Sequence, residues 1–288
     1  MKLPAFDYRS PESIADAIRI LQEEAGAAKV IAGGQSLIPL LAFRLAAPSV
    51  LVDLRDIPGL NGIEIGEDGI SIGAMVRWCD IESHSALQAA HPLLTAAVAH
   101  VAHYQIRNRG TIGGSLAHAD SAAEMPGIAM ACDAELKVVG STGRRLVPAR
   151  KFFVGPLMTT LETDELIESV RLPPWRPDRK WAFEEFAMRR GDFALAGIAL
   201  FYDEEDGRVS DAHVGVIGAG DVPQRLSEVE AVLNGARLDA ATIALAARTA
   251  AGVVEPADDI HASGAYRRAL VETLLERALL RASRAGHP

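Results

Sequence analysis

The chain has 288 residues, a formal net charge of −9 at pH 7 and a pI near 5.4, which argues against nucleic acid or an anionic membrane as a partner. Its length supports two or three compact units, no apolar stretch approaches a membrane span, and residues 1–7 carry no secretory signal, so we expect a cytoplasmic protein. The two cysteines, Cys79 and Cys132, cannot build an iron–sulfur or zinc site, so redox chemistry here would need an organic cofactor.

The first 60 residues predict a small unit of helix and strand. A helix is expected over residues 11–24, with Ser10 as its N-cap and Pro11 at its first position. Strands are expected over residues 29–32 and 49–54, which are short and apolar. The glycine pair Gly33-Gly34 therefore directly follows a predicted strand.

Residues 61–175 predict a second unit of mixed structure. A hairpin is expected around the turn at 67–69 and another around 141–143, with strands at 136–139 and 145–148. The helical spacing favours helices over residues 79–90, 92–102 and 125–132, and residues 165–172 read as a closing strand.

Residues 173–177 contain three prolines and predict a linker, where we place a domain boundary. Beyond it we expect three strands followed by three helices, at 181–188, 194–202, 208–217, 226–233, 239–253 and 265–282. The predicted fold class is α+β, with domains at residues 1–60, 61–175 and 176–288.

Two glycine pairs carry the clearest functional signal. A glycine pair permits positive φ and lets backbone N–H groups approach a phosphate, as expected both at Gly33-Gly34 and at Gly113-Gly114. In the first motif Gln35 and Ser36 add polar side chains and Leu37 begins a helix. A plain strand-to-helix turn is the alternative for one motif alone, but two such motifs suggest two walls of one elongated anionic cofactor.

The second motif has Gly113 and Gly114 flanked by the hydroxyls of Thr111 and Ser115, with Asp120 shortly after. A carboxylate disfavours a phosphate, so Asp120 would accept hydrogen bonds from neutral hydroxyls such as those of a ribityl chain. This division suits a flavin dinucleotide, whereas the absence of a G-x-G-x-x-G motif after the first strand does not support a doubly wound nicotinamide site.

The histidines offer weaker candidates. His100 and His103 share a face of an expected helix, but no third ligand is spaced to complete a metal site, so we predict none. His118 lies inside the second motif, where a cofactor contact and a loop-packing role both remain open. We predict no catalytic residue.

These motifs resemble the FAD signature of the medium subunits of molybdenum hydroxylases, the xanthine dehydrogenase family, and in particular its carbon monoxide dehydrogenase branch. The resemblance covers nearly the whole chain, including residues 164–167 and 189–194. It implies a two-subdomain FAD-binding domain of the vanillyl-alcohol oxidase (PCMH) type and a small α+β C-terminal domain.

The same resemblance implies roles for individual residues. It makes residues 32–37 and 111–115 pyrophosphate loops, makes Asp120 a ribityl contact, and places Leu161 and Phe193 near the flavin ring. The first loop comprises Ala32, Gly33, Gly34, Gln35, Ser36 and Leu37, and the second comprises Thr111, Ile112, Gly113, Gly114 and Ser115. Many relatives carry lysine where this chain has Glu185, which we expect to point to solvent.

By resemblance, the chain carries non-covalent FAD and relays electrons from a small [2Fe–2S] subunit to an external acceptor. A large molybdopterin subunit would oxidise the substrate, and the complex would be a dimer of heterotrimers. Two alternatives remain: a self-contained FAD-dependent oxidoreductase, and a non-catalytic assembly subunit that has lost FAD.

Overall fold

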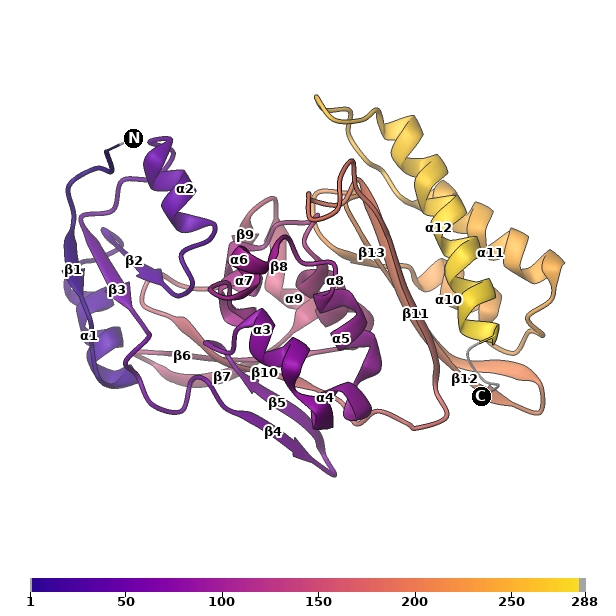
Figure 1. Cartoon of the computed structure of the whole chain (residues 1–288), viewed down its shortest axis with the longest axis horizontal. Coiled ribbons are helices and arrows are strands. Elements are labelled where there is room, and N and C mark those ends of the chain that lie inside the picture. The colour runs from indigo at the N-terminus through magenta and orange to yellow at the C-terminus, as the bar shows by residue number, and fades with distance from the viewer. Residues whose placement is uncertain (1, 285–288) are drawn as a thin grey trace.

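The elements form three parts in a row along the molecule (Figure 1). The computed structural model describes residues 2–284, so the ends of the outermost expected domains, residue 1 and residues 285–288, lie outside it. The first part is a parallel sheet in the order β1-β3-β2, made of β1 (Asp7–Arg9), β2 (Ala28–Ile31) and β3 (Val50–Asp53). Helix α1 (Ile14–Glu23) packs against it, and α2 (Leu37–Ala42) follows the first glycine pair.

Helix α1 begins later than predicted, at Ile14 rather than at residue 11. Ser13 is the N-cap, because its side chain accepts a hydrogen bond from the Asp16 N–H at 3.1 Å. The hydroxyl of Ser10 instead donates to Asp56 at 2.6 Å. The prediction of Ser10 as the N-cap was therefore wrong, because the next serine, Ser13, caps the helix instead.

The middle part contains an antiparallel five-stranded sheet in the order β4-β5-β10-β6-β7. Both predicted hairpins are confirmed, one from β4 (Ile63–Gly66) and β5 (Gly69–Gly73), the other from β6 (Glu135–Gly140) and β7 (Gly143–Pro148). The predicted closing strand is β10 (Leu166–Leu172), which lies between the hairpins and pairs with β5 and β6. It joins them into one sheet.

Short helices and a small two-stranded ladder pack around this sheet (Figure 1). They are α3 (Trp78–Ser83), α4 (Ser85–Ala90), α5 (Pro92–Val98), α6 (Tyr104–Arg107), α7 (Ile112–His118), α8 (Glu124–Ala131), α9 (Ala149–Phe152), β8 (Phe153–Gly155) and β9 (Met158–Thr159). The continuous helix predicted over 79–90 was wrong, because His84 ends α3 and caps α4, its Nδ1 accepting from the Leu87 N–H at 3.1 Å.

The predicted helix over 92–102 ends early, at Val98. His100 and His103 therefore do not share a helix face as expected, and His103 is the N-cap of α6. Within residues 2–284, no group of three histidine, cysteine, aspartate or glutamate residues is arranged to hold a metal ion.

The last part is an antiparallel sheet in the order β11-β12-β13-β14 with three helices on one face (Figure 1). The strands are β11 (Lys180–Phe186), β12 (Ala196–Glu205), β13 (Arg208–Ile217) and β14 (Gln224–Arg225), and the helices are α10 (Ser227–Leu233), α11 (Ala240–Val253) and α12 (Gly264–Arg284). The other face packs on α8, where Gly127 leaves room for Ile217: a Cβ there would lie 2.3 Å from that side chain.

Strand alternation gives this last sheet two buried faces. On β12, Ile198 and Leu200 face the helices, whereas Ala199 and Phe201 join the core of the middle part. The predicted α+β class is confirmed. None of the helices in the described chain is long and apolar enough to cross a membrane.

The residues between β10 and β11 form no helix or strand, in keeping with the proline-rich segment, but they are packed against their neighbours. The Trp175 ring lies 4.5 Å from the buried His91 ring and 5.3 Å from the Phe201 ring, centroid to centroid. Trp175 thus contacts both the middle and the last part.

Candidate functional site

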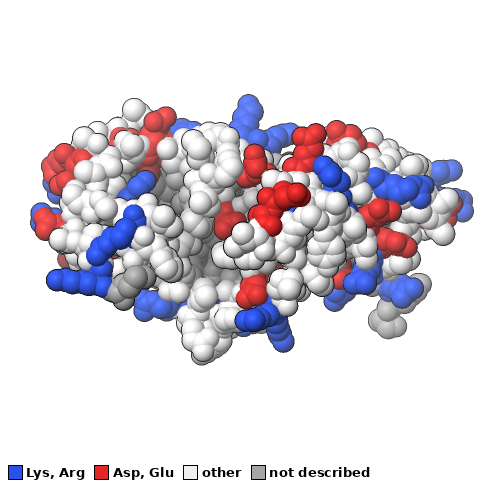
Figure 2. All heavy atoms as spheres, turned by 90° about the horizontal axis from the view of Figure 1, so that it is seen from above, with Lys and Arg blue, Asp and Glu red and all other residues white. Residues whose placement is uncertain are grey.

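A cavity of about 1360 Å³ lies where the three parts meet. It exceeds the roughly 300–1,000 Å³ of typical small-molecule pockets, so it can hold a large ligand. Seen from above, the surface is hollowed between the first part and the rest, and acidic side chains gather toward the C-terminal part (Figure 2). Both glycine motifs line the cavity.

The first motif supplies unused backbone donors. Among the described residues, the N–H groups of residues 33–37 have no main-chain or side-chain acceptor. Gly34 has φ +74°, as predicted for a glycine turn, and the side-chain amide of Gln35 donates to the Gly33 carbonyl at 3.1 Å. The turn can therefore hydrogen-bond anionic oxygens in the cavity.

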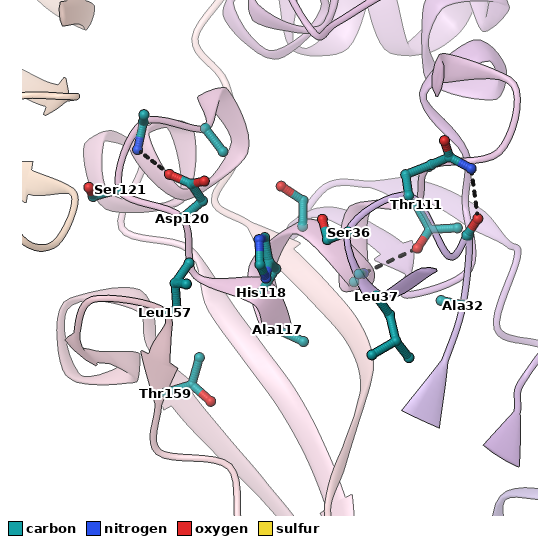
Figure 3. A pocket seen from close by; sticks show the side chains of 18 of the residues that line it. Ala32, Ser36, Leu37, Thr111, Ala117, His118, Asp120, Ser121, Leu157 and Thr159 are labelled. Atoms are coloured by element: carbon teal, nitrogen blue, oxygen red, sulfur yellow. Dashed lines mark hydrogen bonds between the residues drawn. The ribbon is translucent and has the colours of Figure 1, made fainter. Parts of the chain in front are cut away.

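Gly33 is required for a different reason. A Cβ at this position would lie 2.0 Å from the carbonyl oxygen of Arg109 and 2.8 Å from the Cα of Gly110. The first motif therefore packs directly against the chain that leads into the second one. Side by side, the two motifs form one end of the cavity (Figure 3).

The second glycine pair is helical, not a loop with positive φ as expected. Thr111 caps α7, accepting from the Gly114 N–H at 3.1 Å, and the Gly113 N–H donates to the Ala74 carbonyl at 2.9 Å. A Cβ on Gly113 would lie 2.5 Å from the Ala74 Cβ. Gly113 thus serves close packing of α7, and its N–H is already used.

Asp120 lies at the other end of the cavity, just after α7 (Figure 3). Ala119 has φ +54° and ends the helix, and one Asp120 oxygen accepts from the Ala122 N–H at 2.9 Å. The other oxygen has no hydrogen bond to the described chain and is available to donors in the cavity.

The carboxylates that line the cavity are unevenly distributed along the sequence. The lining residues up to Ser115 include Lys29 and no carboxylate, whereas all of the acidic lining residues come from Asp120 onward. They are Asp120, Glu124, Glu162, Glu165, Asp192, Asp221 and Asp259. Neither glycine motif supplies a carboxylate, which favours an anionic group beside them, whereas the free oxygen of Asp120 favours an uncharged hydrogen-bond donor.

The structure brings fourteen of the fifteen predicted site residues to this cavity: Ala32, Gly33, Gly34, Gln35, Ser36, Leu37, Thr111, Gly113, Gly114, Ser115, His118, Asp120, Leu161 and Phe193. The exception is Ile112, whose side chain is fully buried in the core. It packs α7 against the sheet rather than lining the cavity.

The prediction that Glu185 points to solvent was wrong. Glu185 shares a face of β11 with the buried Phe183, and its Oε2 is buried without a hydrogen-bond partner in the described structure. Burial raises the pKa of Glu185 to about 8, and the nearby Glu124 adds to the effect. Burial likewise raises the pKa of Glu124 to about 7.

Several lining residues were not predicted from the sequence, including Ser121, Glu124, Leu157, Thr159 and Arg267. Ser121 and Glu124 could have been suspected from their closeness to Asp120. Thr159 lies in, and Leu157 directly before, a strand of a ladder too short to leave a strand pattern, and Arg267 comes from the far end of the chain.

Comparisons with known proteins agree over the whole chain. Residues 4–175 match the family described as FAD binding domain in molybdopterin dehydrogenase, and residues 181–282 match the CO dehydrogenase flavoprotein C-terminal domain. The nicotine 6-hydroxylase medium subunit of Paenarthrobacter nicotinovorans is 43% identical, with 98% of this chain and 99% of the relative covered.

Two further proteins extend the match. The carbon monoxide dehydrogenase medium chain of Hydrogenophaga pseudoflava is 34% identical, with 96% of each chain covered. The crystal structure of quinoline 2-oxidoreductase from Pseudomonas putida 86 superposes with a TM-score of 0.94 at 39% identity, covering 100% of both chains.

Proposed function

This chain belongs to the FAD-binding medium subunits of the molybdenum hydroxylase family, and we propose that it relays electrons within such a complex. In this proposal electrons arrive from [2Fe–2S] clusters on a small subunit, after a large molybdopterin subunit has oxidised the substrate. The FAD then passes them to an external acceptor. The cofactor of the chain is FAD.

The cavity fits this cofactor in size and in charge. We assign the pyrophosphate to the unused N–H groups of residues 33–37, because these donors line the cavity and neither glycine motif supplies a carboxylate. The ribityl hydroxyls would donate to Asp120, and the flavin ring would lie toward Leu161 and Phe193. Bound there, FAD supplies the ability to exchange electrons singly or in pairs.

The cysteine content supports a division of labour between subunits. A [2Fe–2S] cluster needs four protein ligands, and this chain has two cysteines, of which Cys132 is buried in the core. Clusters that feed this flavin would have to be carried by another chain.

The rim of the cavity supports a partner subunit at its mouth. Four lining residues expose large apolar side chains: Leu157 by 53%, Met158 by 59%, Met188 by 66% and Phe193 by 64%. Exposed large apolar side chains are typical of protein interfaces, so these four residues are the surface that we propose for the partner subunit. A partner covering this rim would lie beside the proposed ring position.

The observation that carries the proposal is the joining of both glycine motifs and Asp120 in one cavity, on a chain without cluster ligands. The test is anaerobic absorbance of the FAD-loaded chain. Dithionite should bleach the flavin band of the isolated chain, whereas a substrate of the complex should bleach it only when the small and large subunits are present.

The matched control is a complex whose small subunit has lost its clusters. Substrate should then leave the flavin oxidised. Bleaching of the isolated chain by a hydroxylation substrate would instead support a self-contained oxidoreductase.

A further inference from the structure

A buried arginine from the C-terminal helix lies beside the cavity. Arg267, in the first turns of α12, is only 7% exposed, and its guanidinium donates to three acceptors. They are the carbonyls of Leu195 at 2.7 Å and Gly218 at 2.8 Å, and the Asp259 carboxylate at 2.7 Å. The planar fork of donors in arginine can serve all three, which a lysine ammonium cannot match in geometry.

These acceptors belong to three segments that line the cavity. Leu195 precedes β12, Gly218 follows β13, and Asp259 lies in the loop before α12. Arg267 therefore fixes the relative positions of two strand ends and one loop. Since its side chain is buried, the guanidinium depends on all three acceptors to offset the loss of water.

Gly218 links this cluster to the Asp120 end of the cavity. Its N–H donates to the Ser121 carbonyl at 2.9 Å, while its own carbonyl accepts from Arg267. The residue has φ +70°, and a Cβ would lie 2.8 Å from the Ala194 carbonyl oxygen. Gly218 is thus held between the β12 end and the turn that carries Asp120.

We propose that Arg267 is a positioning residue for the flavin half of the FAD site, acting through Gly218 and Ser121 on the Asp120 turn. The inference rests on the proposed placement of the ribityl chain at Asp120. The C-terminal part thereby controls how tightly the flavin end is held, while the pyrophosphate end is held by the glycine motifs, which lie outside the C-terminal part.

The test compares two ligands on apo protein, FAD and ADP, because ADP contains only the adenylate half. Arg267→Gln should raise the dissociation constant for FAD by about tenfold or more, since it loses charge-assisted hydrogen bonds, and change that for ADP by less than about twofold. Arg267→Lys keeps the charge and should have a smaller effect of the same selectivity. Arg277→Gln, an exposed arginine further along the same helix, is the matched control and should bind both ligands normally.

A double-mutant cycle separates positioning from general stability. Asp120→Ala should weaken FAD and spare ADP, and adding Arg267→Gln to it should then cost less than about threefold, because coupled residues are not additive. Additive effects, or a parallel loss of FAD and ADP affinity in both Arg267 variants, would overturn the inference. Normal FAD affinity in Asp120→Ala would overturn the ribityl placement and the inference with it, leaving the electron-relay proposal to its own test.

Discussion

The buried Glu185 should make the protein less stable as pH rises, and Glu185→Gln should remove its contribution to this dependence. The carboxyl group extends from β11, is destabilised in its charged form by the nearby Glu124, and has one oxygen that is buried without a hydrogen-bond donor in the described structure. Its charged form is therefore disfavoured in the folded state, while the unfolded chain ionises it freely.

The size of this loss of stability follows from the shift in the pKa of Glu185. A rise from the ordinary 4.5 to about 8 means that the folded state holds the proton more tightly than the unfolded state. Stability is then unaffected below about pH 4.5 and falls progressively until about pH 8, by an upper limit of about 5 kcal/mol at 1.36 kcal/mol for each pKa unit. Glutamine has the same shape and no charge, so the variant should gain stability over wild type as pH rises.

The assay is urea unfolding of the wild type and the variant at pH 6, 7 and 8.5. The difference in unfolding free energy should widen with pH, and it includes the repulsion between Glu185 and Glu124 that the variant removes. Glu184→Gln is the matched control, because Glu184 faces α12 and pairs with the exposed Arg281 at 3.0 Å. Parallel stability curves for wild type and Glu185→Gln would refute the reasoning.

Two further predictions concern particular contacts. Gly33→Ala should lower both the melting temperature and the FAD affinity, because its Cβ would lie 2.0 Å from the Arg109 carbonyl oxygen. Gly62→Ala is the control and should change neither, because nothing lies within 4 Å of a Cβ there. Equal melting temperatures for the two variants would count against the packing described for the first motif. His91 is buried with its pKa lowered to about 4 by burial, so wild type should lose up to about 3 kcal/mol of stability as pH falls from 6.5 to 4. His91→Asn keeps a good N-cap and should lose that slope in acid unfolding, and an unchanged slope would mean that His91 is not its source.

Much of the fold could be predicted because its signals are local. Both hairpins carry their turn residues, and the long helices of the last part show the helical period. The central place of β10 could not be predicted, because a strand pattern does not reveal its neighbours. The strands β1, β8, β9 and β14 span only two or three residues, too few for any periodicity.

The sequence identified most residues of the candidate site correctly, but it assigned several of them the wrong structural role. Glycine marked the right positions, but only Gly34 of the two pairs has positive φ, and Gly33 and Gly113 are needed for close packing. Gly33 packs against Arg109 and Gly113 packs against Ala74, and the sequence alone does not reveal these contacts. Glu185 could have been placed correctly, since alternation along its strand puts it on the same face as Phe183.

The electron relay is tested most directly by rapid mixing of the isolated FAD-loaded chain with the pre-reduced small subunit, under anaerobic conditions. The proposal predicts that the flavin absorbance bleaches while the cluster absorbance returns to its oxidised form, with no substrate and no large subunit present. A flavin that stays oxidised beside a cluster that stays reduced, in a mixture shown to form the complex, would contradict it.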